Sequence, residues 1–251
     1  MTNCKLTISY DGARYDGFAR KGKDESNNTI EVKILDVLRR MPDLNGEELE
    51  LSVACRTEKG VNAIAQVINF KTEARLKAIE VKNYLNRYLP RDISCIDAEL
   101  SDERFNSQLN LKRICYEYRI DATKVADVFL RRYYYHTFVR PDIELMRECG
   151  KLFLGEHDFT EFTTAKKAKS YIKRIDSVEI EEIDDKIYIR VTANAFLHNM
   201  ARLIIGAILD VGLGDRSLES VRISLSGKKC DAKNPILPVE SFALFLKSVE
   251  Y

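Results

Sequence analysis

The sequence has no apolar run that approaches about 18 residues, the length that a membrane-spanning helix needs. Its N-terminus, MTNCKLTISY, lacks the long apolar core of a secretory signal, so we expect no signal peptide. It also lacks a CxxC pair: the six cysteines are irregularly spaced, and the three histidines show no metal-ligand spacing. These absences predict no membrane contact and no metal site, and they indicate reduced thiols, mostly core fillers, in a cytoplasmic protein.

An excess of charge of either sign is also absent. The chain has 251 residues, of which 40 are Lys or Arg and 39 are Asp or Glu, so its overall charge does not indicate a nucleic-acid partner. Such a partner would have to bind local basic clusters, although short charge runs are more often solvated surface. Four clusters are present: Arg39 with Arg40, Arg131 with Arg132, the lysines of 166–169, and Lys228 with Lys229.

Hydrophobic periodicity predicts two similar α+β halves. At 45% hydrophobic content, the chain can form a sizeable core. Alternating patterns predict strands at 5–10, 114–120, 177–183 and 186–192. A short strand is also expected at 93–96, and the apolar run 242–246 is typical of a strand. Helical patterns predict a first helix that is capped by Thr29 and ended by Pro42, and further helices at 78–88, 143–154 and 197–211. Strands, then a helix, then strands, twice over, indicate an N-terminal half of residues 1–104 and a C-terminal half of residues 105–251 that share one sheet.

Several turns and loops are predicted from local signals. The polar loop 13–28 is expected to expose Tyr15 and Phe18. A hairpin turn is expected at Asp184 and Asp185, between two alternating segments. Gly212 is expected to end the last long helix, because glycine is common just after a helix C-terminus.

A short charged motif interrupts two apolar runs in VACRTEKGVNAIAQVINF, residues 53–70. Arg56, Glu58 and Lys59 place three charges within four residues. Charges beside buried strands are costly unless they pair with each other or meet a ligand. The pattern therefore predicts a strand, a turn that carries the Glu58 carboxylate, and a second strand.

The segment R-T-E-K-G-V, residues 56–61, resembles the active-site motif of the tRNA pseudouridine synthase A (TruA) family, R-T-D-x-G-V. Further segments resemble the family's in the same order: YDGARYDGF from residue 10, LPRDI from 89, RF at 104 with YEYRI from 116, GEHDFT from 155 and NAFLHNMAR from 194. No single segment is decisive, but the ordered set is specific. It implies the pseudouridine synthase fold, with a mixed, mainly antiparallel sheet flanked by helices.

Some details separate this chain from the usual family pattern. The spacing from Phe105 to Tyr116 and the R-T-x-K-G wording resemble the eukaryotic-type branch of the family. The family's catalytic Asp is Glu58 here, and Glu31 stands where members often have Gln. The sequence P-V-E-S at 238–241 replaces small residues before the last strand.

Conversion of uridine to pseudouridine sets clear chemical requirements. A carboxylate must lie near the ribose, where it acts either as a nucleophile or as a base. A cation must keep this carboxylate ionised, because burial alone raises a carboxyl pKa. Arginine suits this task, since it stays charged and pairs with both carboxylate oxygens. An aromatic face must hold the detached uracil, and the target nucleotide must leave its stack. The reaction requires no metal and no cofactor.

The resemblance implies which residues meet these requirements. Glu58 takes the catalytic carboxylate position, Arg202 the carboxylate-pairing arginine, and Tyr116 the tyrosine that stacks on the base. Arg56 takes the position of the arginine that holds the flipped nucleotide out. The other residues expected to contact substrate are Lys59, Asn194 and Phe196.

Each of these residues has a simpler structural interpretation. Tyr116 and Tyr118 alternate on a strand, so one of them could simply face the core. Arg202 could face solvent, and His198, alone at a helix start, is more consistent with a structural role. The tyrosines at 133–135 could stack on RNA or pack inside the protein.

The sequence therefore predicts a tRNA uridine isomerase without metal or nucleotide cofactor. The resemblance implies action in the anticodon stem-loop, tRNA as partner and a homodimer. The alternative is an impaired family member that binds RNA, because Glu58 moves the carboxylate by about one bond and a 1 Å misplacement can cost about a hundredfold in rate. The surrounding Arg56, Tyr116 and Arg202 are all retained, which favours activity.

Overall fold

The computed structural model describes residues 1–19, 28–227 and 234–251. These residues form two compact units: residues 1–112 with 246–251, and residues 113–245. The basic pair Lys228 and Lys229 lies outside the described residues. The first unit continues past the expected division at 104/105 because Ser107 hydrogen-bonds within it. Its hydroxyl donates to the Ser52 carbonyl oxygen (2.7 Å), and its amide donates to Asn69 Oδ1 (2.8 Å).

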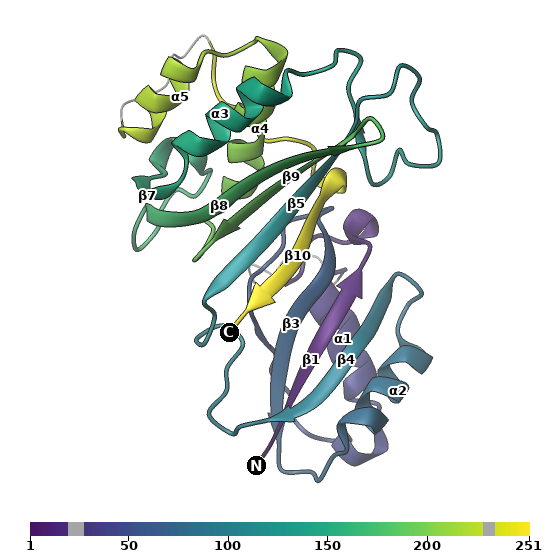
Figure 1. Cartoon of the computed structure of the whole chain (residues 1–251). Coiled ribbons are helices and arrows are strands. Elements are labelled where there is room, and N and C mark those ends of the chain that lie inside the picture. Colours follow the sequence, from purple (N-terminus) through teal and green to yellow (C-terminus); the bar gives the residue numbers. More distant parts are fainter. Residues whose placement is uncertain (20–27, 228–233) are drawn as a thin grey trace. The chain divides into compact units, whose positions relative to one another are not determined.

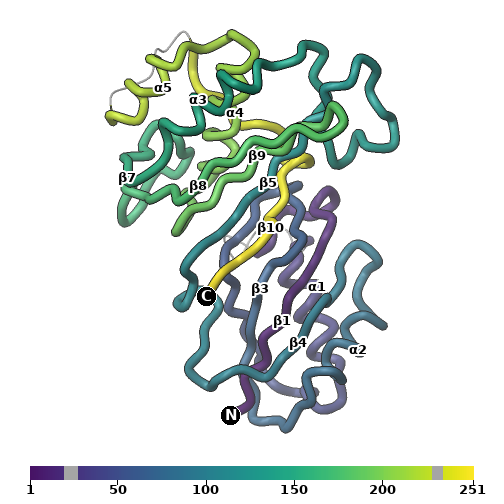
Figure 2. The backbone as a smooth tube through the Cα atoms, viewed as in Figure 1, coloured from purple at the N-terminus to yellow at the C-terminus, as the bar shows by residue number. Residues whose placement is uncertain are grey.

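The first unit is an antiparallel sheet with helices on one face (Figure 1). Its strands β4, β1 and β3 lie in that order, β2 pairs with β3, and the C-terminal residues of β10 also lie beside β3 (Figure 2). The strand bounds are β1 (Thr2–Tyr10), β2 (Ser52–Val53), β3 (Asn62–Thr72), β4 (Ile93–Ser101) and β10 (Leu244–Glu250). The helices are α1 (Ile30–Leu38) and α2 (Ala78–Tyr88), with short 3-10 turns at Gly12–Arg14 and Pro42–Leu44.

Alternation along β1 explains how this sheet buries its core. Every second side chain from Cys4 to Tyr10 is buried, as the sequence pattern predicts. Thr29 caps α1 by accepting a hydrogen bond from the Val32 amide (3.4 Å), which fixes the start of that helix.

The second unit is also a sheet with helices on one face (Figure 1). Its strands β5, β9, β8 and β7 are antiparallel neighbours in that order, and β6 runs parallel to β5. The strand bounds are β5 (Arg113–Asp121), β6 (Tyr135–His136), β7 (Gly155–Asp158), β8 (Ile172–Ile183) and β9 (Lys186–Ala193). The predicted α+β class with mixed, mainly antiparallel pairing and flanking helices is confirmed.

The turns of the second unit follow the sequence in one place and depart from it in another. The β8–β9 hairpin turns at Asp184 and Asp185, both at positive φ (50° and 59°), as predicted. Gly212 does not end the long helix; it is buried inside it, where an added Cβ would lie 2.4 Å from Met146 Cγ. The helix ends at Leu213, and Gly214 (φ 81°) adopts the left-handed conformation just beyond it.

Three helices cover the sheet of this unit: α3 (Ile143–Leu152), α4 (Met200–Leu213) and α5 (Leu218–Leu225). Short 3-10 turns occur at Thr160–Phe162 and Ser241–Ala243. The sequence pattern did not predict α5, which is short, although its Ser217 cap accepts a hydrogen bond from the Ser220 amide (3.2 Å).

The expectation that Tyr15 and Phe18 are exposed was wrong. Both side chains are buried. The Tyr15 hydroxyl donates to Asp92 Oδ1 (2.6 Å), and the Phe18 ring packs 6.3 Å from that of Tyr10. A polar loop therefore contributes two aromatic rings to the core of the first unit.

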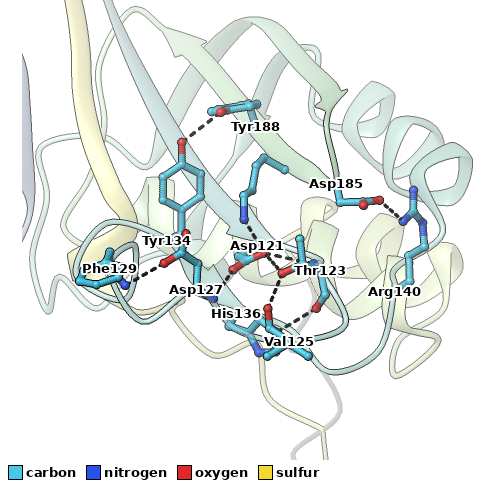
Figure 3. A network of polar contacts seen from close by, with 11 residues as sticks. Asp121, Thr123, Val125, Asp127, Phe129, Tyr134, His136, Arg140, Asp185 and Tyr188 are labelled. Carbon is cyan, nitrogen blue, oxygen red and sulfur yellow. Dashed lines mark hydrogen bonds and ion pairs between the residues drawn. The ribbon is translucent and has the colours of Figure 1, made fainter.

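The connection from β5 to α3 is organised by Asp121 (Figure 3). This buried carboxylate accepts hydrogen bonds from the Lys186 ammonium (2.7 Å) and the Thr123 hydroxyl (2.5 Å). Tyr134 pairs with Tyr188 through their hydroxyls (3.0 Å), and the rings of Tyr133 and Tyr135 each pack against another aromatic ring. These contacts favour the packing interpretation of the three tyrosines.

The cysteines behave as predicted for reduced core thiols. No disulfide joins the five described cysteines, of which Cys4, Cys95 and Cys149 are buried, and Cys230 lies outside the described residues. Burial raises the pKa of Cys4 and of Cys149 to about 12 and that of Cys95 to about 11, so these three remain protonated near neutral pH.

Candidate active site

The charged motif lies in the connection between β2 and β3, as the sequence predicts. Two hydrogen bonds fasten the base of this connection to β3. The Ala54 amide donates to the Val67 carbonyl oxygen (3.0 Å), and the Gln66 side-chain amide donates to the Cys55 carbonyl oxygen (2.8 Å). The segment therefore leaves the sheet from a fixed point, just before Arg56.

Thr57 anchors the middle of the motif. Its side chain is buried, and its hydroxyl lies 2.7 Å from the Tyr10 hydroxyl on β1. Its carbonyl oxygen accepts a hydrogen bond from the Phe18 amide (3.0 Å). Burial raises the pKa of Tyr10 above its usual range, so the phenol stays neutral beside Thr57.

The turn after Thr57 is tight and has little space around it. Gly60 has φ 77°, and the Val61 amide donates to the Glu58 carbonyl oxygen (3.2 Å). A Cβ on Gly12 would lie 2.0 Å from the Val61 carbonyl oxygen, so only glycine fits there. The backbone of Glu58 is thus held on both sides.

The three charges of the motif have different surroundings. Arg56 and Lys59 are exposed, whereas Glu58 between them is half-buried. Lys59 Nζ forms an ion pair with Asp16 Oδ1 (2.8 Å). Among the residues that the structure describes, Arg56 makes no ion pair or hydrogen bond through its side chain. The loop therefore presents one unengaged guanidinium next to a less exposed carboxylate.

Tyr116 belongs to the second unit, on β5. Its side chain is only 7% exposed, and its ring meets that of half-buried Phe196 edge to face, with centroids 5.1 Å apart. Tyr118, two residues further along the same face of β5, is fully buried. Both tyrosines are therefore buried on the same face of β5, as the core-facing alternative has it, and Tyr116 keeps a small exposed fraction beside Phe196.

Arg202 lies in the first turn of α4, and its guanidinium is held by two contacts. Its Nε donates to the Val239 carbonyl oxygen (2.7 Å), and its Nη1 donates to Asn199 Oδ1 (3.2 Å). These contacts disfavour the solvent-facing alternative, because the side chain is half-buried and oriented by these partners.

A close approach of backbone to α4 makes the Val239 contact available. A Cβ on Gly206 would lie 2.2 Å from the Leu237 carbonyl oxygen. The segment 237–239 therefore lies directly on the helix, and the Val239 amide also donates to the Arg202 carbonyl oxygen (3.2 Å). The unusual P-V-E-S sequence at 238–241 thus supplies backbone partners for Arg202.

Asn194 and His198 have structural partners. Asn194 Oδ1 accepts a hydrogen bond from the Arg174 amide (3.1 Å), and the Asn194 amide donates to the Arg174 carbonyl oxygen (3.1 Å). The carbonyl oxygen of His198 accepts from the Thr163 hydroxyl (2.8 Å) and the Thr164 amide (3.2 Å). The contacts of Asn194 thus tie it to the start of β8.

The predicted site residues fall into two groups. Arg56, Glu58 and Lys59 share one loop of the first unit, and the second unit brings Tyr116 into contact with Phe196. The sequence pattern assigned no role to Thr57, which anchors the loop of the first group, or to Asn199, which contacts Arg202. The available signals were the position of Thr57 inside the motif and that of a cap-type residue, Asn199, just before α4.

Two classes of site are not found in the part of the chain that the structure describes. No three His, Cys, Asp or Glu side chains gather as metal ligands there. Within the same residues, no helix has the length and apolar character needed to cross a membrane.

Known proteins resemble this chain along its whole length. A family model described as tRNA pseudouridine synthase matches residues 150–251. tRNA pseudouridine synthase A 2 of Bacillus anthracis is 40% identical over 252 residues, covering 100% of both chains. tRNA pseudouridine synthase A of Bacillus subtilis (strain 168) is 34% identical and covers 98% of both chains. With full-length identity at this level, the chain belongs to the tRNA pseudouridine synthase A family.

Proposed function

We propose that this chain isomerises uridine to pseudouridine in tRNA, with Glu58 as the carboxylate that acts at the ribose. The observation that carries the proposal is the anchored turn of the R-T-E-K-G-V motif in a chain similar to tRNA pseudouridine synthases over its full length. Because the backbone of Glu58 is held between Thr57 and Gly60, its side chain starts from a fixed point. Such positioning is what this kind of catalysis requires.

The carboxylate acts either as a nucleophile at the sugar or as a base that removes a sugar proton. Glu58 supplies a carboxylate, as aspartate would, on a side chain that is longer by one methylene group. Its half-buried position between two exposed cations keeps it reachable by a flipped nucleotide. We therefore infer that glutamate can act at this position of the motif.

The remaining roles follow from the family assignment. Tyr116, held edge to face by Phe196, is proposed to stack on the detached uracil, since a fixed ring loses little entropy on binding. Arg202, oriented by Val239 and Asn199, is proposed to keep the catalytic carboxylate ionised. Arg56 is proposed to hold the flipped nucleotide out of its stem.

We also propose the finer properties that the family assignment implies. They are action in the anticodon stem-loop, a homodimer, a cytoplasmic location, and substrate contacts from Lys59 and Asn194. The relatives' names specify tRNA, and an exposed guanidinium at Arg56 suits phosphate contact. No nucleotide cofactor has a role in this chemistry.

The test is tritium release from a tRNA transcript labelled at uridine C5. The chain as it stands should release tritium, and Glu58→Gln should not, because the amide can act neither as nucleophile nor as base. The rate of tritium release by Glu58→Asp, compared with that of the unmodified chain, shows which side-chain length suits the site better. Release by Glu58→Asp alone would instead support an impaired family member that binds RNA. If neither the unmodified chain nor Glu58→Asp released tritium from C5-labelled bulk tRNA, the proposal would be overturned.

A further inference from the structure

A chain of hydrogen bonds joins a lysine-rich loop to Arg202 within the second unit. The loop covers residues 163–170 and exposes Lys166, Lys167 and Lys169. Thr164 Oγ1, at the start of the loop, accepts a hydrogen bond from Asn199 Nδ2 (2.8 Å). Asn199 Oδ1 in turn accepts from Arg202 Nη1 (3.2 Å). One side-chain amide therefore bridges the loop and the arginine.

The backbone conformation of Asn199 allows its side chain to form this bridge. Its φ of 60° and ψ of 6° place it in the left-handed region just before α4. Asparagine and glycine are the residues that adopt this conformation most readily. An ordinary helix cap would turn its side chain toward the first amides of the helix, but no such hydrogen bond is made here. The side chain bonds Thr164 and Arg202 instead.

The loop is fastened to the same turn by its backbone. The carbonyl oxygen of His198 accepts from both the Thr163 hydroxyl (2.8 Å) and the Thr164 amide (3.2 Å). The Thr163 hydroxyl also accepts from the Ala165 amide (3.1 Å). With the bond from Asn199 to Thr164, three hydrogen bonds link the start of the loop to residues 198 and 199. A shift of the loop would therefore also displace residues 198 and 199, at the start of α4.

We infer that Asn199 is a positioning residue for Arg202, and that tRNA phosphates held by the lysines of loop 163–170 are coupled to that arginine through it. This inference rests on the proposed function. Three lysines within four residues repel one another, and phosphates would neutralise them and steady the loop. A steady loop fixes the Thr164 hydroxyl, which fixes the Asn199 amide and, through it, the guanidinium of Arg202.

Variants of Asn199 and Thr164 test the bridge with the conformation preserved. Asn199→Gly keeps the left-handed backbone and removes both side-chain bonds, so we expect kcat to fall about tenfold with KM little changed. Asn199→Asp keeps the acceptor for Arg202 and offers the Thr164 hydroxyl a carboxylate oxygen to which it can donate, so kcat at saturating tRNA should stay within a few-fold of the unmodified chain. Equal losses in Asn199→Gly and Asn199→Asp would overturn the positioning role. Melting temperatures identify any variant that simply unfolds.

A double-mutant cycle tests the coupling to the loop. Replacing the three lysines by alanine should raise KM and lower kcat in the unmodified chain, but should raise only KM in the Thr164→Val background. Lys151→Ala, an exposed lysine in the last turn of α3, serves as the charge control. Additive effects on kcat in both backgrounds would overturn the coupling.

Hydrogen exchange gives a readout that does not need turnover. tRNA binding should slow amide exchange in residues 198–203 of the unmodified chain. It should slow this exchange less in the variant whose three loop lysines are replaced by alanine, and less in Asn199→Gly. Protection that is identical in all three proteins would overturn the inference. If tRNA gave the expected protection while no tritium was released, the proposed isomerisation would fail and the coupling between loop and arginine would stand.

Discussion

The hydroxyl of Tyr10 lies 2.7 Å from that of Thr57, and this contact links the R-T-E-K-G-V motif to the central strand β1. Tyr10 is buried at the end of β1, so its hydroxyl is held by the core of the first unit. Because Thr57 directly precedes Glu58, the position of the Glu58 carboxylate depends on the buried hydrogen bond between the Tyr10 and Thr57 hydroxyls.

Tyr10→Phe should therefore lower activity more than its stability loss suggests. It leaves the buried Thr57 hydroxyl without this partner, which costs about 1 kcal/mol in the free energy of unfolding. The loop should also gain freedom at Glu58, which we expect to lower kcat several-fold. Denaturant unfolding and tritium release measure the two effects, and Tyr84→Phe, which removes an exposed hydrogen bond to the Arg40 carbonyl oxygen, is the control.

Two glycines with similar backbone conformations should respond differently to alanine. Gly17 (φ 103°) and Gly155 (φ 94°) each incur about 1–2 kcal/mol of left-handed strain as alanine. At Gly17 the new Cβ would also lie 2.9 Å from the Thr57 carbonyl oxygen, whereas at Gly155 nothing lies within 4 Å. We expect Gly17→Ala to unfold at lower denaturant concentration and to lose activity, and Gly155→Ala to lose stability alone. Equal activity in the two variants would argue against loop anchoring by this contact.

Tyr116 should matter more for turnover than for affinity. Tyr116→Phe keeps the ring and its edge-to-face contact with Phe196, so kcat should stay within a few-fold of the unmodified chain. Tyr116→Ala removes the stacking face, which is worth about 1–3 kcal/mol per base and so about 5- to 150-fold in kcat. Single-turnover rates and tRNA binding separate the two effects. Equal losses in rate and in affinity would show that Tyr116 only packs.

Salt dependence should identify Arg56 as a phosphate contact. tRNA affinity should fall steeply as salt rises, because each neutralised phosphate releases counterions. If Arg56 holds one phosphate, Arg56→Ala should reduce the slope of log affinity against log salt by roughly one. The control is Arg222→Ala, an exposed arginine already paired with Glu219 (3.6 Å). A slope unchanged by Arg56→Ala would remove this contact.

Asp121 should make stability fall in acid. Burial disfavours its charge, but the Lys186 ammonium and the Thr123 hydrogen bonds outweigh burial and hold the pKa of Asp121 well below its usual range. A carboxyl whose folded pKa is lowered stabilises the fold above its unfolded pKa of about 3.9, and this contribution is lost as pH falls further. Asp121→Asn should therefore cost up to about 3 kcal/mol at pH 7.

The difference between Asp121→Asn and the unmodified chain should shrink as pH falls below about 4, because Asp121 of the unfolded chain takes up a proton there while Asp121 of the folded chain stays ionised down to its own, lower pKa. Urea unfolding across pH measures this difference. The exposed Asp185, paired with Arg140, is the control, and Asp185→Asn should change stability little at any pH. A constant difference for Asp121→Asn down to the lowest pH would contradict the lowered pKa.

Local periodicity determined most of the secondary structure. The helix at 78–88 and the hairpin at 184–185 occur where the pattern predicts them, because amphipathic spacing and turn residues act over a few positions. The charged turn of the motif could be recognised for the same reason. Gly212 was misassigned because its role depends on Met146, which packs against it from a different helix.

The side chains that hold the functional ones could be identified only from packing in the folded chain. Tyr15 and Phe18 belong to a polar loop by sequence and to the core by packing. The partners of Arg202 come from Asn199, three residues away, and from Val239, which approaches α4 because Gly206 has no side chain. The sequence by itself determined the chemistry that the motif can perform, since this depends on residue type and order. The orientation of each group depends on contacts between distant segments, and these form only when the chain is folded.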